Sequence, residues 1–245
     1  MNQGIYALSA TMVNQLNRVD LLSNNIANVN TTAFKQDNLV EGSFNYYLKQ
    51  LSEKEQTISD VSDPQLIRLN NVTNTIPKID GEYMKEDIGA LIQTGNKLDF
   101  ALNQTDMFFK VQDKNGNLLL TKSGNFKNLN GLLVTEDGYK VLDKQNKPIV
   151  INNQFEEKIA LVKSDFSNLQ KQGNNNYLIK NEKDTQIVPS NHGYILQGTL
   201  EKSNVNMINS MVALIDSQRR IEQAQKAISG IDQINGKLIT QIGNR

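Results

Sequence analysis

The sequence lacks cysteine and tryptophan altogether and has a single histidine among its 245 residues. Without cysteine the chain can form no disulfide, no thiolate nucleophile and no cysteine-based zinc site. The histidine, His192, precedes Gly193 in a turn-like segment, so a Ser-His-Asp arrangement would depend on one side chain that is expected to face solvent. The carboxylates sit beside turn signals and show no desolvated pair. These absences predict a protein that is not an enzyme and has no cofactor or metal site.

Charge and hydrophobicity argue against two further classes of partner. The chain carries 26 basic and 26 acidic side chains, and neither sign dominates a long stretch, so no basic groove for nucleic acid is expected. No apolar run approaches the roughly 18–20 residues that span a bilayer, which predicts no membrane insertion. Residues 1–30 lack the positive start, unbroken apolar run and cleavage site of a signal peptide. If the protein is exported, we expect a route that leaves no cleaved signal.

Residues 1–30 are predicted to form an amphipathic helix. Apolar side chains recur at spacings of three and four, the stripe of a helix that packs on another helix. The stripe consists of Ile5, Leu8, Met12, Leu16, Val19, Leu22 and Ile26. Arg18 and Asp20 are the only charges before Lys35, and the other faces are mainly Asn, Gln, Ser, Thr and Ala. Because Asn competes for backbone hydrogen bonds, this helix is expected to be weak alone and stable when neighbours cover it.

A second amphipathic helix is predicted from Ser203 to about Gln241. Its stripe consists of Met207, Met211, Leu214, Ile221, Ile228, Ile231, Ile234 and Leu238, and Ile208, Val212 and Ile215 widen it. Ser203 or Asn204 is expected to cap the start of the helix by accepting a hydrogen bond from a free backbone N–H. Gly230 lies inside the run and weakens it by roughly 1 kcal/mol relative to Ala.

Between the helices the pattern changes from helix to strand. Residues 33–75 show no sustained periodicity and are interpreted as a partly extended connector. From there to residue 202, short apolar runs alternate with turn signals. The candidate strands are 98–102, 108–111, 118–121, 132–134, 139–142, 149–151, 159–162, 177–179, 186–188 and 194–196. Lys114–Asn117, Asn130-Gly131 and Asp137-Gly138 are expected to form type I′ hairpin turns, because Asn and Gly accept positive φ.

The predicted fold class is therefore α+β, with the terminal helices pairing as a coiled-coil-like unit and an all-β domain inserted at about residues 76–198. The predicted domains are a terminal helical assembly domain (1–32 and 203–245), the connector (33–75) and the β-domain (76–202). On periodicity alone, two terminal helices fit a simple antiparallel hairpin about as well as an assembly device. The lack of charge on their remaining faces favours assembly into a filament or tube. A second interpretation is a secreted carbohydrate-active or adhesive β-protein with a helical hairpin as its base.

Three stretches resemble the bacterial flagellar rod and hook protein family. Residues 23–35 read Ser-Asn-Asn-Ile-Ala-Asn-Val-Asn-Thr-Thr-Ala-Phe-Lys, which is similar to its N-terminal signature. Residues 203–207 read Ser-Asn-Val-Asn-Met and residues 211–220 read Met-Val-Ala-Leu-Ile-Asp-Ser-Gln-Arg-Arg, which are similar to its C-terminal signature. Residues 121–126 (Thr-Lys-Ser-Gly-Asn-Phe) and 131–142 (Gly-Leu-Leu-Val-Thr-Glu-Asp-Gly-Tyr-Lys-Val-Leu) are similar to its β-domain core.

The resemblance implies a structural axial subunit, more similar to a rod member than to a hook-type member, that helps to transmit torque from motor to hook. It implies a place in the basal body, with other rod and hook subunits and the flagellar type III export apparatus as partners. It also implies terminal helices that are disordered in the monomer and form an inner tube. The sequence departs from the family at three positions. The family usually has Gly at Ala33, an acidic residue at Ser210 and an aromatic residue at Ile221, and Ala resists positive φ.

The candidate site is an assembly interface carried by both termini. Its residues are Leu8, Met12, Leu16, Val19, Leu22, Asn24, Asn25, Ile26, Asn28, Asn204, Asn206, Met211, Leu214, Ile221 and Ile228. The apolar members are expected to pack within and between subunits, with burial of apolar surface contributing about 25 cal/mol per Å². The asparagines are expected to tie chain ends and turns through amide hydrogen bonds.

Overall fold

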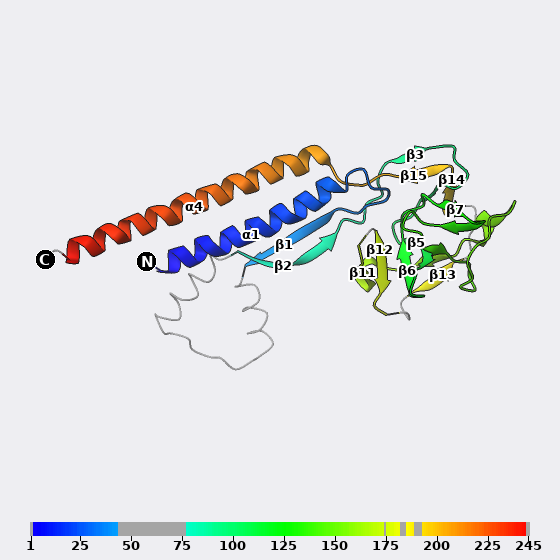
Figure 1. The fold of residues 1–245 in the computed structure, drawn as a ribbon, viewed down its shortest axis with the longest axis horizontal. Coiled ribbons are helices and arrows are strands. Elements are labelled where there is room, and N and C mark those ends of the chain that lie inside the picture. Colours follow the sequence, from blue (N-terminus) through cyan, green and yellow to red (C-terminus); the bar gives the residue numbers. More distant parts are fainter. Residues whose placement is uncertain (1, 44–76, 174, 182–184, 189–192, 244–245) are drawn as a thin grey trace. The chain divides into compact units, whose positions relative to one another are not determined.

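Two long helices occupy the ends of the sequence, and a β-rich region lies between them in the sequence (Figure 1). The computed structural model describes residues 2–43, 77–173, 175–181, 185–188 and 193–243. The first helix, α1, runs over Asn2–Ala27 (26 residues), and the last, α4, runs over Met207–Gly243 (37 residues). This agrees with the predicted α+β class. The predicted turn at His192 and most of the predicted connector lie outside the described residues.

The strands are short and fall into one large sheet and three small pairs. They are β1 (Asp37–Ser43), β2 (Pro77–Met84), β3 (Leu91–Gln93), β4 (Phe100–Leu102), β5 (Met107–Gln112), β6 (Leu118–Thr121), β7 (Lys127–Leu129), β8 (Leu132–Val134), β9 (Lys140–Val141), β10 (Leu161–Lys163), β11 (Leu169–Lys171), β12 (Asn176–Ile179), β13 (Gln186–Val188), β14 (Ile195–Gln197) and β15 (Thr199–Glu201). Two 3₁₀ helices, η1 (Phe155–Lys158) and η2 (Phe166–Asn168), interrupt them. The small pairs are β1–β2, β14–β4 and β15–β3.

The chain divides into two compact units. The helical unit contains α1, β1, β2 and α4. The β unit contains residues Ala27–Gln36 and Met84–Asn206. β1 therefore belongs with the helices, although its sequence lies in the stretch that was interpreted as a connector.

Strand β5 is the centre of the large sheet, whose order is β11-β12-β6-β5-β9-β8-β7. Along one edge β5 pairs with β6, and along the other it pairs with β9 and β10. Its run Met-Phe-Phe-Lys-Val is buried throughout, because both faces of the sheet are covered. Phe109 packs in the main cluster with Phe100, Phe126 and Val111, while Phe108 points to the opposite cluster.

The two clusters give the β unit its core. The main cluster includes Phe100, whose ring lies 5.9 Å from that of Phe126 and 6.0 Å from that of Phe155 between centroids. The second cluster joins Phe108, Phe166 and Tyr177 edge to face at 5.2–6.0 Å. Such aromatic pairs contribute about 0.5–1.5 kcal/mol beyond the area they bury. The core is thus built by the strands that the alternating apolar runs predicted.

Only one of the three predicted type I′ turns has that geometry. Asn130 (φ 51°) and Gly131 (φ 82°) both have positive φ and join β7 to β8, as a type I′ turn requires. In the other two turns only the glycine, Gly116 (φ 91°) or Gly138 (φ 79°), is left-handed, so the prediction there is wrong. At the turn formed by residues 114–117, the preceding residue Asp113 explains the difference.

The carboxylate of Asp113 holds its turn in the right-handed form. Its Oδ1 accepts the backbone N–H groups of Asn115 and Asn117, each at 2.8 Å, which favours a right-handed conformation before Gly116. Asp143 repeats this arrangement with the N–H groups of Gln145 and Lys147, also at 2.8 Å. The left-handed position there is Asn146, with φ 63°. An aspartate at the first position therefore overrides the Asn-Gly signal.

The helix ends agree only partly with the sequence. α1 ends at Ala27, three residues before the predicted end at residue 30, and α4 continues unbroken through Gly230. α4 begins at Met207, so neither Ser203 nor Asn204 caps it, and that prediction is wrong. Ser203 Oγ instead accepts the N–H of Val205 at 3.3 Å, and the Asn204 amide bonds to other segments.

Candidate assembly surfaces

The predicted interface residues of α1 are distributed over several faces of the helix. Leu22 and Asn25 are buried, and Leu8, Met12, Val19 and Ile26 are half-buried. Leu16 remains 45% exposed, together with two apolar side chains that the stripe did not include, Tyr6 at 69% and Val13 at 53%. Of the asparagines, Asn24 is exposed and Asn28 is half-buried. α1 thus carries apolar side chains on covered and on exposed positions.

The Asn25 side chain joins α1 to the start of β1. Its Nδ2 donates to the carbonyl oxygen of Asp37 at 2.8 Å, and its Oδ1 accepts the Asp37 N–H at 3.1 Å. The side-chain amide of Asn25 therefore bonds to the backbone of Asp37 with one donated and one accepted hydrogen bond, as a neighbouring strand would. Just beyond the helix, Asn28 Oδ1 accepts the hydroxyl of Thr31 at 3.1 Å. These two contacts are of the kind expected for the asparagines.

α4 has a regular covered face, which we call the α4 seam. Its members are buried or half-buried and alternate at spacings of four and three: Ser210, Leu214, Ser217, Ile221, Ala224, Ile228, Ile231 and Asn235. Ser210 (3%), Ser217 (2%) and Ala224 (5%) are its most buried positions and stand seven residues apart. Small residues at one heptad position let another backbone approach closely. The predicted residues Leu214, Ile221 and Ile228 all belong to this seam.

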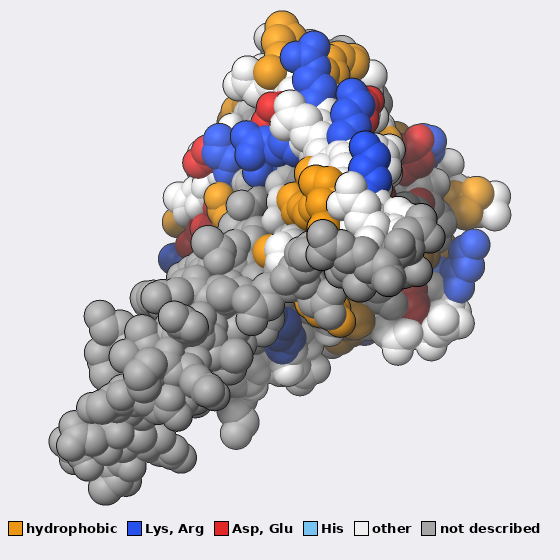
Figure 2. Space-filling model, turned by 90° about the vertical axis from the view of Figure 1, so that its left-hand side faces the viewer, with side chains coloured by type: hydrophobic (Ala, Val, Ile, Leu, Met, Phe, Trp, Pro, Cys, Tyr) orange, Lys and Arg blue, Asp and Glu red, His pale blue; other side chains and the backbone are white. Residues whose placement is uncertain are grey.

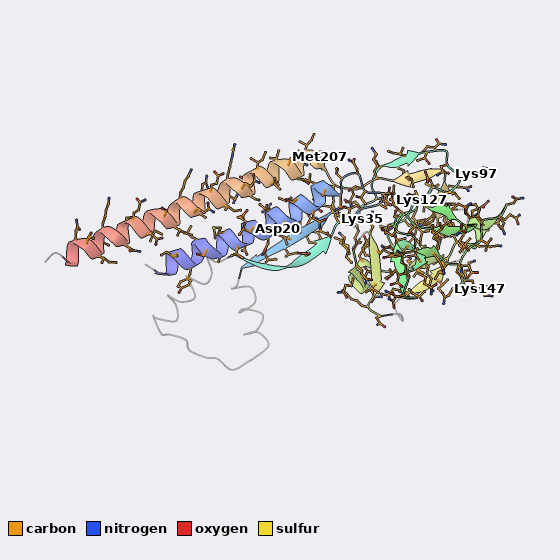
Figure 3. The ribbon with its side chains drawn as sticks, viewed as in Figure 1. Asp20, Lys35, Lys97, Lys127, Lys147 and Met207 are labelled. Carbon is orange, nitrogen blue, oxygen red and sulfur yellow. The ribbon has the colours of Figure 1, made fainter. Side chains whose placement is uncertain are left out.

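A second apolar set on α4 is exposed, and we call it the α4 outer set. It consists of Met207, Ile208, Met211, Val212, Ile215, Ile234, Leu238 and Ile239, which are 39–74% exposed. Met207, at the start of the helix, is labelled in Figure 3. Hydrophobic side chains reach the molecular surface among Lys and Arg side chains (Figure 2). The predicted single stripe is therefore two sets, and Met211 belongs to the outer one.

The β unit contains a buried ion pair that the sequence did not indicate. The Nζ of Lys35, in the segment that follows α1 (Figure 3), lies 2.7 Å from Oε1 of Glu201 and 2.7 Å from the carbonyl oxygen of Asp87. The two side chains are 0% and 1% exposed. Glu201 Oε1 also accepts the N–H of Gly89 at 2.9 Å. In the sequence, the only feature that pointed to this ion pair was the position of Lys35 at the end of the N-terminal family signature. No sequence feature pointed to Glu201.

Asn204 binds the same region through its side chain. Its Oδ1 accepts the Gln36 N–H at 2.8 Å, and its Nδ2 donates to the carbonyl oxygens of Lys85 at 2.8 Å and Asp87 at 3.0 Å. The amide therefore contacts two segments distant in sequence. Asn206, the other predicted asparagine here, is exposed.

Lys122 is a second buried cation of the β unit. Its Nζ donates to the carbonyl oxygen of Gln104 at 2.8 Å and lies 4.9 Å from the centroid of the Phe108 ring. Burial and, to a smaller extent, the positive charge of Lys35 lower the pKa of Lys122 to about 7, although the carboxylates of Glu201, Asp106 and Glu86 act in the opposite direction. A large part of the Lys122 population is thus neutral near pH 7.

No catalytic constellation emerges from the residues that the structure describes. Across residues 2–43, 77–173, 175–181, 185–188 and 193–243 there is no group of three His, Asp or Glu side chains able to hold a metal ion. In the same part of the chain, neither helix is both long enough and apolar enough to span a bilayer.

Comparisons with known proteins match the ends and the middle of the chain to flagellar proteins. Residues 5–35 match the family model "Flagella basal body rod protein". Residues 104–165 match "Flagellar hook protein FlgE/F/G D1 domain", and residues 196–242 match "Flagellar basal body rod FlgEFG protein C-terminal". These three matches lie on α1 and its exit, on the large sheet, and on β15 and α4.

Curated relatives align over almost the whole chain. The flagellar basal-body rod protein FlgF of Caulobacter vibrioides is 27% identical over 99% of both chains. The rod protein FlgG of Agrobacterium fabrum is 30% identical over 93% of this chain and 95% of its own, and FlgG of Borreliella burgdorferi is 30% identical over 96% and 97%.

The three family models that match α1, the large sheet and α4 all describe rod and hook proteins of the flagellum, a structural class of protein. The chain belongs to the flagellar basal-body rod protein family that includes FlgF and FlgG. That family is structural and not enzymatic, so the chain is a structural subunit of the rod in the flagellum basal body, with other rod and hook subunits as its partners. The interpretation as a carbohydrate-active or adhesive protein is therefore set aside.

Proposed function

We propose that the chain is an FlgF-type rod subunit that assembles through α1 and α4 and helps to transmit torque from motor to hook. The alternative within the family is a FlgG-type distal-rod or a hook-type subunit. The segment from Asn96 to Val111 and the short length resemble FlgF most, and the FlgF relative from Caulobacter vibrioides aligns over 99% of both chains. FlgG relatives of similar identity keep the alternative open to test.

The observation that carries this proposal is the division of apolar side chains on α4 into a covered seam and an exposed outer set. The α4 seam repeats at four and three residues, and the covered apolar set of α1 (Leu8, Met12, Val19, Leu22 and Ile26) follows the same repeat, with the buried Gln15 at the intervening position. Matching heptads are the requirement for two helices to pack knobs into holes. We therefore propose that α1 and α4 pair as a coiled-coil-like unit within one subunit, which leaves the outer set for neighbours.

The α4 outer set supplies the contact between subunits in this proposal. Fully burying a side chain of the size of Ile, Met or Val stabilises an interface by about 1.5–3 kcal/mol, and eight such residues are exposed on one helix. The outer set lies on α4, and the exposed Tyr6, Val13 and Leu16 lie on α1. A contact between one set and the other would be heterologous, and such a contact propagates as a helix where its rotation does not close into a ring. Residues 1–32 and 203–245 would then form the assembly domain, and residues 76–202 would form the β-domain.

The route of export is part of the same proposal. By its resemblance to the family, the chain would pass unfolded through the flagellar type III apparatus without a cleaved signal, and it would bind neither nucleic acid nor the membrane.

The test uses a chain that contains no cysteine of its own. A single photoreactive cross-linker is placed at the exposed position 16 in α1 or position 212 in the α4 outer set, and cross-linked partners are identified from assembled flagella. We expect partners from the rod, together with copies of the chain itself. A cross-linker at the exposed Lys147, a residue of the β unit labelled in Figure 3, is the matched control. Partners from the hook alone would favour the hook-type alternative, and no axial partner at either position would overturn the proposal.

A further inference from the structure

The chain crosses between its two units four times, next to residues 26, 36, 83 and 206. On the side of the β unit, three segments lie beside three of these crossings. They are 33–36, 85–89 and 201–204, and they come from three distant parts of the sequence. Backbone hydrogen bonds connect them: Ala33 N–H donates to Glu201 O at 2.8 Å, and Lys85 N–H donates to Gln36 O at 2.8 Å.

Three side chains join all three segments, and we call Lys35, Glu201 and Asn204 the exit clamp. Asn204 reaches Gln36 in the first segment and Lys85 and Asp87 in the second. Lys35 reaches Asp87 in the second segment and Glu201 in the third. Each side chain of the clamp therefore bonds to segments other than its own.

The clamp is closely packed, and its side-chain polar atoms form hydrogen bonds except Glu201 Oε2, which is buried without a partner. A Cβ on Gly89 would lie 1.9 Å from the carbonyl oxygen of Lys202, so only glycine lets the second and third segments approach this closely. Lys35 and Glu201 are both fully buried, and hydrogen bonds to charged groups are stronger where water is excluded. When one bond of such a network is removed, its former partner remains buried without a hydrogen bond, which costs free energy. The stability of each segment therefore depends on the other two.

We propose that the exit clamp makes segments 33–36, 85–89 and 201–204 open and close as one cooperative element, so that load on any one chain crossing is shared by the others. Lys35, Glu201 and Asn204 are positioning residues for force transmission. The inference rests on the proposed function, because only an axial subunit carries torque through these crossings. If the clamp were absent, the segments would open singly, each at the cost of its own few bonds.

Amide hydrogen exchange in the full-length chain tests the proposal. In Asn204→Ala we expect exchange of the Gly89 and Lys202 amides to accelerate at least tenfold, although Asn204 bonds to neither. The Gly89 N–H donates to Glu201 and the Lys202 N–H donates to Ala90 O at 2.9 Å, so their exchange reports the clamp at a distance. The amides of the β5–β6 pair should keep their protection, which shows that the β unit remains folded.

The matched control is Asn168→Ala. Asn168 also bridges backbone with both ends of its amide, donating to Asn181 O at 2.9 Å and accepting the Asn181 N–H at 3.1 Å, but it lies away from the clamp. Its removal should leave the Gly89 and Lys202 amides unchanged. If Asn204→Ala does not fold, Asn204→Asp is the second variant, because it retains Oδ1 and loses the two donated bonds. It should also accelerate exchange of the Gly89 and Lys202 amides.

Acceleration confined to Gln36, the amide that Asn204 binds directly, would overturn the clamp. The presence of the chain in purified basal bodies is a separate readout. If the unmodified chain is present in basal bodies and Asn204→Ala shows only local acceleration, the clamp is refuted and the proposed function stands. If the unmodified chain is absent from basal bodies, the proposed function is refuted, whatever exchange the variants show.

Discussion

Ala33 is fully buried and has a φ of 55°, in the left-handed region that favours glycine. The family usually has Gly here, so the turn is retained although the side chain opposes it. We predict that Ala33→Gly raises the free energy of unfolding by about 0.5–1 kcal/mol, because the left-handed conformation of a residue with a Cβ costs about 1–2 kcal/mol and glycine loses part of this gain to unfolded-state entropy. Chemical denaturation of the purified chain measures the change.

The comparison variant for this position is Ala33→Val. A β-branched side chain is strained at positive φ and has no space at a fully buried site, so we expect a loss of at least about 2 kcal/mol. Equal effects of glycine and valine would show that conformational strain does not govern this turn.

Lys122 should make the stability of the β unit depend on pH above neutrality. Its pKa is about 7 in the folded chain and 10.5 for a lysine exposed to water, so between these limits the unfolded state binds more protons and stability rises with pH. Below about pH 7 the cost of burying the charge is fully present. Each pKa unit corresponds to about 1.4 kcal/mol, which sets an upper bound of about 5 kcal/mol for the whole range.

We predict that Lys122→Met abolishes this rise, measured as the denaturation midpoint between pH 7 and pH 10. The exposed Lys147→Met is the control and should leave the pH dependence of the wild-type chain in place. A Lys122→Met chain whose stability still rises as steeply would show that another group titrates.

At the scale of elements, the ion pair between Lys35 and Glu201 ties the exit of α1 to β15. Removing one partner leaves an uncompensated buried charge, so we predict that Lys35→Met destabilises the β unit by about 3–5 kcal/mol. The double variant Lys35→Met/Glu201→Gln removes that charge and retains an oxygen for the Gly89 N–H. It should recover more than half of the loss. Denaturation of the two variants and of the single Glu201→Gln variant completes a double-mutant cycle.

The α4 seam offers the corresponding test for the helical unit. Ser217 is 2% exposed, whereas its neighbour Gln218 is exposed. We predict that Ser217→Phe, which overfills a close helix contact, prevents incorporation into basal bodies, and that Gln218→Phe does not. Quantitative immunoblotting of purified basal bodies measures both. Normal incorporation of Ser217→Phe would exclude the seam as a packing surface.

The elements that the sequence predicts well are those governed by local pattern. Helical periodicity predicted α1 and α4, and the apolar run at 108–111 predicted a strand that the structure contains as β5. The type I′ turns were predicted too often, and at 114–117 the reason is that the Asn-Gly signal ignores the hydrogen bonds that the preceding Asp113 accepts. The Lys35–Glu201 pair was not predicted, since its members are 166 positions apart and neither belongs to a hydrophobic pattern. Contacts of this kind form only in the tertiary structure and produce no periodic pattern in the sequence.

For the whole molecule, the exposed apolar surface of the helical unit bears on the state of the free subunit. With eight apolar side chains of α4 exposed, an isolated chain gains little from keeping that helix ordered. We predict that limited proteolysis of the purified chain removes the termini and spares the β unit, whose core is closed on both faces of its sheet. Mass spectrometry of the fragments identifies the boundaries. Termini that resist protease in dilute monomer would contradict this expectation.

The unequal lengths of the two terminal helices have a consequence for stacking. At 1.5 Å per residue, the 26 residues of α1 extend about 39 Å and the 37 residues of α4 about 55 Å. Even in full register, α1 cannot accompany α4 over its last 16 Å or so. That overhang, about three helical turns, is available to a subunit of an adjacent layer. A stagger of this kind would interlock successive layers, so that no plane across the rod is free of a bridging helix.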